Sequence, residues 1–340
     1  MIARGRDVWE WLQKADRRRV RNAIGLWSSY RTARRTKTPR IGGMPFSVSF
    51  EPTTACNLRC PECPSGLRSF TRPTGNLNSD LFRRVIDELA PDLWALTFYF
   101  QGEPYINPRF LEMVDHARSK GLYTATSTNA HFLDDARAEA TVRSGLSRLI
   151  ISIDGTSQET YSAYRRNGEL AKVIEGTKRV IEWKRRLKSR TPHVIFQFLV
   201  VKPNEHEIPE ARKLAKQLGV DELWLKTAQI YDPHDDHPLI PQQDRYSRYR
   251  RSENGKWQVK NALADECWKM WHSCVITWDG RVVPCCFDKD AQHAMGDLRT
   301  HTFKELWYGE TYDRFRKALL HSRNDLEMCR NCSEGSPVWA

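Results

Sequence analysis

Three cysteines stand close together near the start of the chain, in the segment Cys56-Asn-Leu-Arg-Cys60-Pro-Glu-Cys63. The segment follows a short apolar run typical of a buried strand. Three thiolates at this spacing can surround one metal centre. A structural zinc site requires four protein ligands, whereas a [4Fe–4S] cluster held by three cysteines leaves one iron open for a small-molecule ligand. Zinc with a distant fourth ligand is the alternative at this point.

Strand-like apolar runs alternate with helical segments over residues 46–227, and the helices at 80–90 and 208–219 have the clearest period. Such units predict a parallel sheet with helices outside it, as an open doubly wound sheet or a partial barrel. Both place ligand sites at the carboxyl ends of strands, where the cysteine segment falls. The predicted strands span 46–52, 94–101, 123–129, 147–154, 194–201 and 221–227.

The CX3CX2C segment after a first strand, at the head of repeated β/α units, resembles the radical S-adenosylmethionine superfamily. The resemblance implies a partial (β/α)6 barrel and a [4Fe–4S] cluster held by Cys56, Cys60 and Cys63. It also implies that S-adenosylmethionine binds the open iron. Reduction of the cluster then splits this cofactor, and the resulting 5′-deoxyadenosyl radical removes a hydrogen atom from substrate. The cofactor carries this chemistry, and the protein positions it.

Further motifs fall in order at the ends of successive predicted strands. In the family, a GEP element after the second strand contacts the methionine amino group, and residues after the third and fourth strands line the same pocket near the ribose and carboxylate. An arginine farther along often binds the methionine carboxylate. Glu62 departs from the family pattern, which often has an aromatic residue before the third cysteine. The implied cofactor-binding residues are Gly102, Glu103, Pro104, Ser127, Asn129, Ser152, Asp154 and Arg165.

Six more cysteines lie between residues 267 and 332. Their arrangement around Gly280, with a closing CX2C, resembles a twitch or short SPASM domain. The resemblance implies a second, auxiliary [4Fe–4S] cluster held by Cys267, Cys285, Cys329 and Cys332. We expect the other two, Cys274 and Cys286, to be small buried thiols. Paired cysteines also suit zinc, but the upstream motif favours iron and sulfur.

We expect four segments: a basic, helical N-terminal arm (1–45), the barrel (46–227), a polar linker (228–263) and a small Cys-rich α+β domain (264–340). In the last segment, Asp279-Gly280 predicts a tight hairpin turn within 275–284. A helix over 303–320 is expected to lead to the final cysteine pair.

The charge of the chain is concentrated in its first residues. Residues 1–40 carry +9 of a formal net charge of +12. We interpret the arm as an amphipathic helix packed on the barrel, and such a helix can also meet an anionic membrane or an acidic partner. Nucleic acid is not an expected partner, because no recognised binding module accompanies the charge. Without a secretory signal or an apolar span, we expect a cytoplasmic protein that this arm can hold at the membrane periphery.

Superfamily members with one auxiliary cluster include a dehydrogenase that oxidises an alcohol of an aminocyclitol. The leading hypothesis is therefore oxidation of a small hydroxylated molecule, with the auxiliary cluster accepting an electron and a flavodoxin or ferredoxin as external donor. Modification of a peptide, by thioether formation or epimerisation, is the second hypothesis. A non-catalytic zinc adaptor, whose arm binds membrane or nucleic acid, is the third. No motif marks the substrate or a general base.

Overall fold

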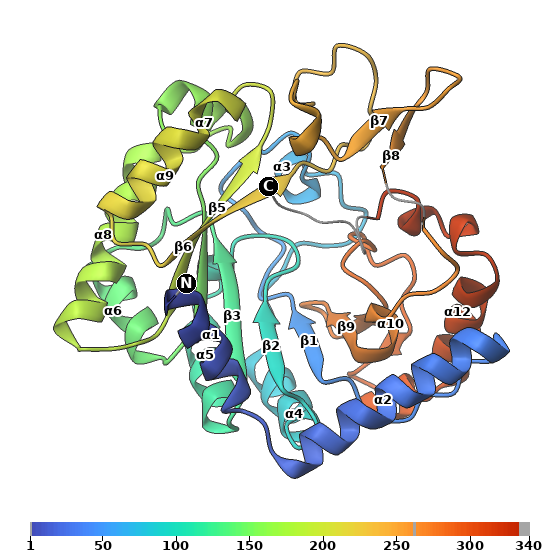
Figure 1. Ribbon diagram of the computed structural model, residues 1–340. Helices are drawn as coiled ribbons and strands as arrows, with labels where there is room; N and C mark the ends of the chain where they lie inside the picture. Colours follow the sequence, from blue (N-terminus) through green and yellow to red (C-terminus); the bar gives the residue numbers. More distant parts are fainter. Residues whose placement is uncertain (1, 261–262, 333–340) are drawn as a thin grey trace.

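The computed structural model describes residues 2–260 and 263–332 of the chain. Its centre is a nine-stranded sheet of order β11-β10-β9-β1-β2-β3-β4-β5-β6 (Figure 1). Strands β1 to β6 run parallel, and the sheet ends at β6 and β11 without closing. All six parallel strands were predicted, each within its range or starting one residue earlier. They are β1 Ser47–Phe50, β2 Ala95–Phe98, β3 Tyr123–Thr128, β4 Arg148–Ser152, β5 His193–Val200 and β6 Glu222–Thr227.

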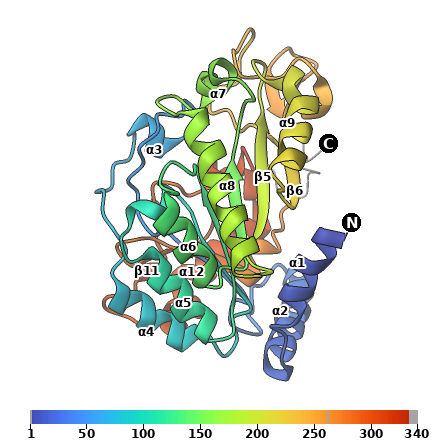
Figure 2. The same ribbon diagram turned by 90° about the vertical axis from the view of Figure 1, so that its left-hand side faces the viewer.

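Helices cover the outer face of the parallel strands (Figures 1 and 2). In the first of them, the Asn78 side chain caps the helix by accepting two backbone N–H bonds. Its apolar side chains recur with helical spacing, so one face is buried. Phe82 on that face packs against Phe50 and Phe98, with ring centroids 5.0 and 5.5 Å apart. The helices are α4 Ser79–Leu89, α5 Phe110–Ser119, α6 Asp135–Arg143, α7 Gln158–Tyr164, α8 Leu170–Arg186 and α9 Ile208–Gln217. Shorter helices lie at α3 Pro64–Leu67, η1 Pro104–Ile106 and η2 Glu205–Glu207.

The Cys-rich C-terminal segment continues the same sheet. Strand β9 (Ser273–Ile276) pairs in parallel with β1, and β10 (Arg281–Val283) returns antiparallel to it. The turn between them contains Asp279 and Gly280, whose φ is 87°, so the predicted hairpin is confirmed. The remaining elements are α10 Lys269–His272, β11 Gly296–Asp297, α11 Phe303–Trp307, α12 Glu310–His321, η4 Arg323–Asp325 and η5 Glu327–Cys329.

The single helix predicted over 303–320 is wrong, because α11 and α12 are separate helices. Gly309 lies between them with extended backbone (φ −71°, ψ 159°) and begins the second helix. Glycine is a poor helix former, so the break costs little at this position. The break lets Trp307 turn into the core, where its indole N–H donates to the carbonyl of Gly43 at 2.9 Å.

Residues 228–263, expected to be a connecting segment, also contain regular structure. A short helix, η3 (Asp244–Tyr246), precedes a hairpin of β7 (Tyr249–Arg251) and β8 (Trp257–Val259). Gly255 in its turn has a φ of 77°. The preceding residue is Asn254, and Asn-Gly is a strong hairpin signal that the sequence analysis overlooked.

The first helix of the N-terminal arm, α1 (Ile2–Leu12), lies across the amino-terminal end of the parallel strands. Its buried Asp7 accepts a hydrogen bond from the Tyr123 hydroxyl at 2.5 Å and pairs with Arg148. These two partners are the first residues of β3 and β4. The helix therefore closes the end of the barrel opposite the strand carboxyl ends.

The second helix of the arm, α2 (Arg17–Thr36), connects the barrel to the Cys-rich segment. Its buried Arg19 donates to backbone carbonyls of the loops that precede β2 and β3. Farther along, Tyr30 contacts the rings of Trp268 and Trp271 at 5.2 and 5.3 Å. Among the helices of the described residues, none is both long enough and apolar enough to cross a membrane.

Candidate active site

A cavity of ≈ 160 Å³ opens at the carboxyl ends of β1 to β4. It brings together nine of the predicted site residues from five separate segments: Cys56, Cys60, Cys63, Gly102, Glu103, Ser127, Asn129, Ser152 and Arg165.

Two predicted cofactor-binding residues do not line this cavity. Pro104 is buried at the start of η1. Asp154 is fully buried behind Arg165, whose guanidinium it binds, and its other oxygen accepts the N–H of Leu199 at 2.7 Å. Burial raises the pKa of Asp154, and the adjacent Arg165 opposes that rise. Asp154 therefore fixes the orientation of Arg165 instead of facing a ligand.

The cysteine segment is held by packing rather than by regular structure. Leu58 is buried in an apolar cluster with Tyr164 and Tyr249. On the other side, a Cβ added at Gly66 would lie 2.5 Å from the backbone N and O of Cys60. Only glycine allows this close approach of the two backbone segments.

The three thiols fit a metal cluster. Burial raises the pKa of Cys56 to about 12, and it raises the pKa of Cys60 as well. Buried thiols with raised pKa values become thiolates when a metal binds them. Sulfur is the only ligand type among the three, which suits iron–sulfur chemistry.

Polar side chains approach each sulfur at longer range. Arg165 Nη1 lies 3.9 Å from Cys60 Sγ, and Asn129 Nδ2 lies 3.9 Å from Cys56 Sγ. The Gln101 amide oxygen lies 4.0 Å from Cys63 Sγ. Hydrogen bonds to cluster sulfurs and nearby charges set reduction potentials. Arg165 and Asn129 approach with N–H donors and would be able to tune a cluster held by these thiols, whereas the Gln101 oxygen can only accept a hydrogen bond from the Cys63 thiol.

The side chain of Glu103 has a structural task that the sequence analysis did not predict. Its carboxylate accepts hydrogen bonds from the Thr128 hydroxyl and the Asn129 backbone N–H, both at 2.7 Å. Burial raises its pKa to about 7, although these hydrogen bonds oppose the rise. Glu103 thus joins the end of β2 to the end of β3. Gly102 must be glycine, because its φ is 74° and an added Cβ would lie 2.2 Å from the Thr53 carbonyl oxygen.

Glu62, the residue that departs from the family pattern, connects the cysteine segment to the linker. Its carboxylate accepts the backbone N–H of Tyr231 at 2.9 Å and lies 3.7 Å from His237. The hydroxyl of Tyr231 in turn contacts Lys289 of the Cys-rich segment at 2.6 Å. The acid therefore helps to hold the linker beside the cavity.

The four cysteines expected to hold the auxiliary cluster are all buried, with side chains 4–8% exposed. Arg323 links two of their segments, since it donates to the Glu266 carbonyl at 2.6 Å and lies 3.5 Å from Cys332 Sγ. Cys274 lies in the main apolar core, as expected of a buried thiol. Cys286 is only half-buried, and the ammonium of Lys269 lies 3.1 Å from its sulfur.

Among the described residues, no group of three or more Cys, His, Asp and Glu side chains is arranged to hold a single metal ion.

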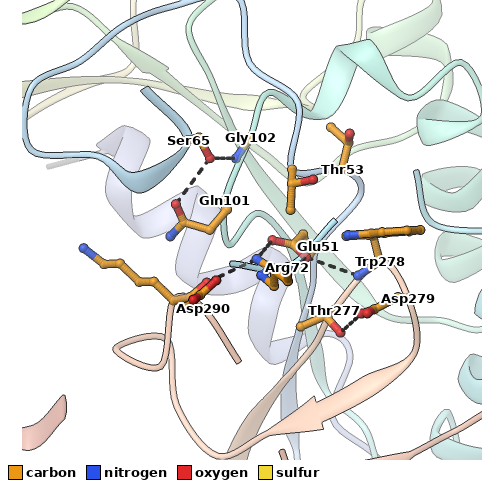
Figure 3. Close-up of polar contacts among 12 residues, drawn as sticks. Glu51, Thr53, Ser65, Arg72, Gln101, Gly102, Thr277, Trp278, Asp279 and Asp290 are labelled. Atoms are coloured by element: carbon orange, nitrogen blue, oxygen red, sulfur yellow. Dashed lines mark hydrogen bonds and ion pairs between the residues drawn. The ribbon is translucent and has the colours of Figure 1, made fainter. Parts of the chain in front are cut away.

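A buried ion pair joins the barrel to the Cys-rich segment, and the sequence analysis missed it (Figure 3). Arg72 donates to both carboxylate oxygens of Glu51, at 2.6 and 2.5 Å. Glu51 also accepts the backbone N–H of Trp278 from the β9–β10 turn at 3.2 Å, and Arg72 donates to the Lys289 carbonyl at the same distance. The only signal was an acidic residue, Glu51, directly after an apolar strand.

Two family models match the chain. The model of the Radical SAM superfamily matches residues 50–215, and the model of an iron-sulfur cluster-binding domain, SPASM, matches residues 267–333. The chain belongs to the radical SAM superfamily. The resemblance and the fold class inferred from the sequence are therefore confirmed. This radical SAM protein is an enzyme that uses S-adenosylmethionine, a [4Fe–4S] cluster and a second, auxiliary [4Fe–4S] cluster.

The radical SAM protein is 25% identical over 330 residues to the tungsten-containing aldehyde ferredoxin oxidoreductase cofactor-modifying protein of Pyrococcus furiosus, covering 83% of this chain and 86% of that one. It is also 25% identical over 315 residues to a PqqA peptide cyclase of Gluconobacter oxydans, covering 87% and 84%. The solved structure of BtrN in complex with AdoMet and 2-DOIA superposes with a TM-score of 0.53 at 17% identity, covering 86% and 94%. That likeness shows a shared fold.

Proposed function

We propose that this enzyme oxidises a small hydroxylated molecule by two electrons, with Cys56, Cys60 and Cys63 holding the cluster that binds S-adenosylmethionine. When bound, S-adenosylmethionine and its cluster would supply hydrogen-atom abstraction at the carbinol carbon, and the auxiliary cluster would supply an acceptor for the remaining electron, while a base would remove the hydroxyl proton. Hydrogen atom, proton and electron together account for conversion of the alcohol to a carbonyl. An external donor of the flavodoxin or ferredoxin class supplies the electron that starts each turnover.

Different sides of the cavity would bind different parts of S-adenosylmethionine and its cluster. Three thiols occupy one side, and the polar strand ends at Ser127, Asn129 and Ser152 occupy the other. Arg165, oriented by Asp154, presents a fixed positive charge suited to the methionine carboxylate. Glu103 holds the β2 and β3 ends at a constant separation, so the cavity keeps its shape without ligand.

The proposal of an oxidation rests on the four cysteines of the C-terminal segment. Cys267, Cys285, Cys329 and Cys332 are all buried, and four thiolates complete the ligand set of a [4Fe–4S] cluster. A cluster with no open iron cannot bind substrate directly, so its use is to accept or donate electrons. Removal of a hydrogen atom from an alcohol carbon leaves one electron to be removed, and this cluster is suited to receive it.

Peptide modification is the second candidate, and one observation favours it. The relative from Gluconobacter oxydans is named for a peptide substrate, PqqA, and the match covers 84% of its length. A saturated auxiliary cluster serves oxidative cyclisation as well as alcohol oxidation. The two candidates therefore differ in substrate and not in cofactors.

Extracts can separate these candidates before the substrate is known. Reconstituted enzyme, S-adenosylmethionine and dithionite are incubated anaerobically with a low-molecular-weight extract, and 5′-deoxyadenosine formed above the substrate-free rate is measured. We expect stimulation that survives protease treatment of the extract. Stimulation destroyed by protease would replace the first proposal with the second.

A further inference from the structure

The N-terminal arm exposes an unusual share of the apolar surface. Of the ten large apolar side chains that are exposed in the described structure, six lie between residues 8 and 27. Trp9 and Ile24 are 62% and 63% exposed. We call this set the N-terminal apolar face; its members are Val8, Trp9, Leu12, Val20, Ile24 and Trp27.

This face is not the side of the arm that holds the fold together. Helix α2 packs on the protein through Leu26, Tyr30 and Ala33, all of which are buried. Val20, Ile24 and Trp27 recur at helical spacing on a different side of the same helix. The helix therefore has two apolar stripes. Trp27 of the outer stripe also contacts the Trp268 ring, with centroids 5.2 Å apart, but it is still 47% exposed, and Val20 and Ile24 are 41% and 63% exposed.

Positive charge surrounds the outer stripe. Helix α2 contains seven arginines and no acidic residue. Three of the seven are engaged elsewhere, because Arg18 pairs with Asp92, Arg34 pairs with Glu266 and Arg19 is buried. Within the described part of the chain, the exposed arginines 17, 21, 31 and 35 form no ion pair.

Both helices are placed so that a flat surface can reach them. Figure 2 shows α1 and α2 together at one edge of the molecule, with no other element outside them. Tryptophan and aliphatic side chains beside arginines are the composition of helices that lie in a bilayer interface, where anionic headgroups meet the basic residues.

We infer that the N-terminal apolar face binds the surface of an anionic lipid bilayer, with α1 and α2 lying in the headgroup layer. Helix α1 closes the amino-terminal end of the barrel through Asp7, and the cavity opens at the carboxyl ends of the strands. Docking through this face therefore leaves the cavity directed away from the lipid, so that the substrate arrives from the aqueous side.

The test is flotation of the full-length, cluster-loaded enzyme with vesicles of phosphatidylglycerol and phosphatidylcholine, or of phosphatidylcholine alone. We expect binding only to the anionic vesicles, weakened by salt. Each arginine near the surface contributes about fivefold to partitioning, so R21E combined with R31E should lower it at least about twentyfold. I24D should abolish it. The matched control, R212E with K213E on exposed positions of α9, should bind as the parent does.

Each variant must still form 5′-deoxyadenosine at the parent rate, which shows that it is folded. Equal flotation with neutral vesicles, or no flotation with either, would overturn the inference. Sedimentation that reveals a dimer lost in I24D, together with no vesicle binding, would assign the face to a second copy of the chain. Binding to single-stranded nucleic acid in place of vesicles would overturn it as well.

Discussion

Arg72 and Glu51 form a two-hydrogen-bond ion pair from which solvent is excluded, with side chains 2% and 0% exposed. The pair lies where the loop after the first cysteine segment meets the β9–β10 hairpin (Figure 3). Breaking a buried pair leaves one charge without a partner, which costs far more than the pair itself contributes.

We therefore expect R72M to lower the free energy of unfolding by about 3–5 kcal/mol, because the Glu51 carboxylate stays buried without a partner. Adding E51Q should restore part of the loss. The matched control is R109M, which breaks an exposed pair with Glu112 and should change stability by less than about 1 kcal/mol. Anaerobic urea titration measures all four proteins. Equal, small effects of R72M and R109M would contradict the assigned role of the buried pair.

The carboxyl of Glu103 predicts a pH dependence of stability. Its pKa is raised by burial from 4.5 to about 7, so between these values the folded protein binds more protons than the unfolded chain. The contribution of Glu103 to the free energy of unfolding is fully present below pH 4.5 and is lost as the pH rises to about 7. The total loss is about 3 kcal/mol. The substitution E103Q should flatten that slope in protein free of S-adenosylmethionine. An unchanged slope in E103Q would show that other groups cause it.

We expect replacement of Asp154 to weaken cofactor binding, although Asp154 does not itself line the cavity. In D154N, Arg165 loses the carboxylate that fixes its guanidinium. We expect the Kd of S-adenosylmethionine to rise about 10- to 100-fold, as happens when a group that orients a ligand-binding residue is removed. Equilibrium binding to reconstituted protein measures the change, with the iron content kept equal to that of the parent. An unchanged Kd would remove Arg165 from the carboxylate-binding role.

We expect replacement of an auxiliary cysteine to separate cleavage of S-adenosylmethionine from oxidation of the substrate. C329A should lose the iron of one cluster and the oxidised product, while 5′-deoxyadenosine still forms. C274A is the matched control, because Cys274 is a buried thiol of the apolar core and its loss should leave the iron content unchanged. Iron and sulfide analysis and product analysis are made on the same samples. Full turnover in C329A would contradict an electron-accepting role for the second cluster.

The residues that carry the chemistry of this chain were easier to predict than the residues that hold them in position. Metal-binding cysteines must be close in sequence to lie on one loop, so their spacing is visible in the chain itself. Each of the six parallel strands is a short run rich in β-branched, aliphatic or aromatic residues between segments of helical period, so all six were also found. Family motifs pointed to Gly102 after the second strand and to Arg165 farther along the chain, and the structure gathers both in one cavity.

The interactions that hold the site in position are contacts between residues far apart in the sequence, and no local pattern reveals them. Arg72 meets the Lys289 carbonyl across 217 positions. The roles of Asp154 and Glu103 were assigned to the cofactor, although their carboxylates are occupied by Arg165, Thr128 and Asn129. The parallel pairing of β9 with β1, which merges the two parts into one sheet, is likewise a long-range contact.

The most direct test of the account measures 5′-deoxyadenosine in anaerobic protein reconstituted with iron and sulfide and supplied with dithionite and S-adenosylmethionine. The parent, C60A and C274A are compared at equal protein concentration, in the presence of stimulating extract. The account predicts 5′-deoxyadenosine from the parent and from C274A, and none above background from C60A. Equal amounts from the parent and C60A would contradict the assignment of Cys56, Cys60 and Cys63 to the cluster that cleaves S-adenosylmethionine.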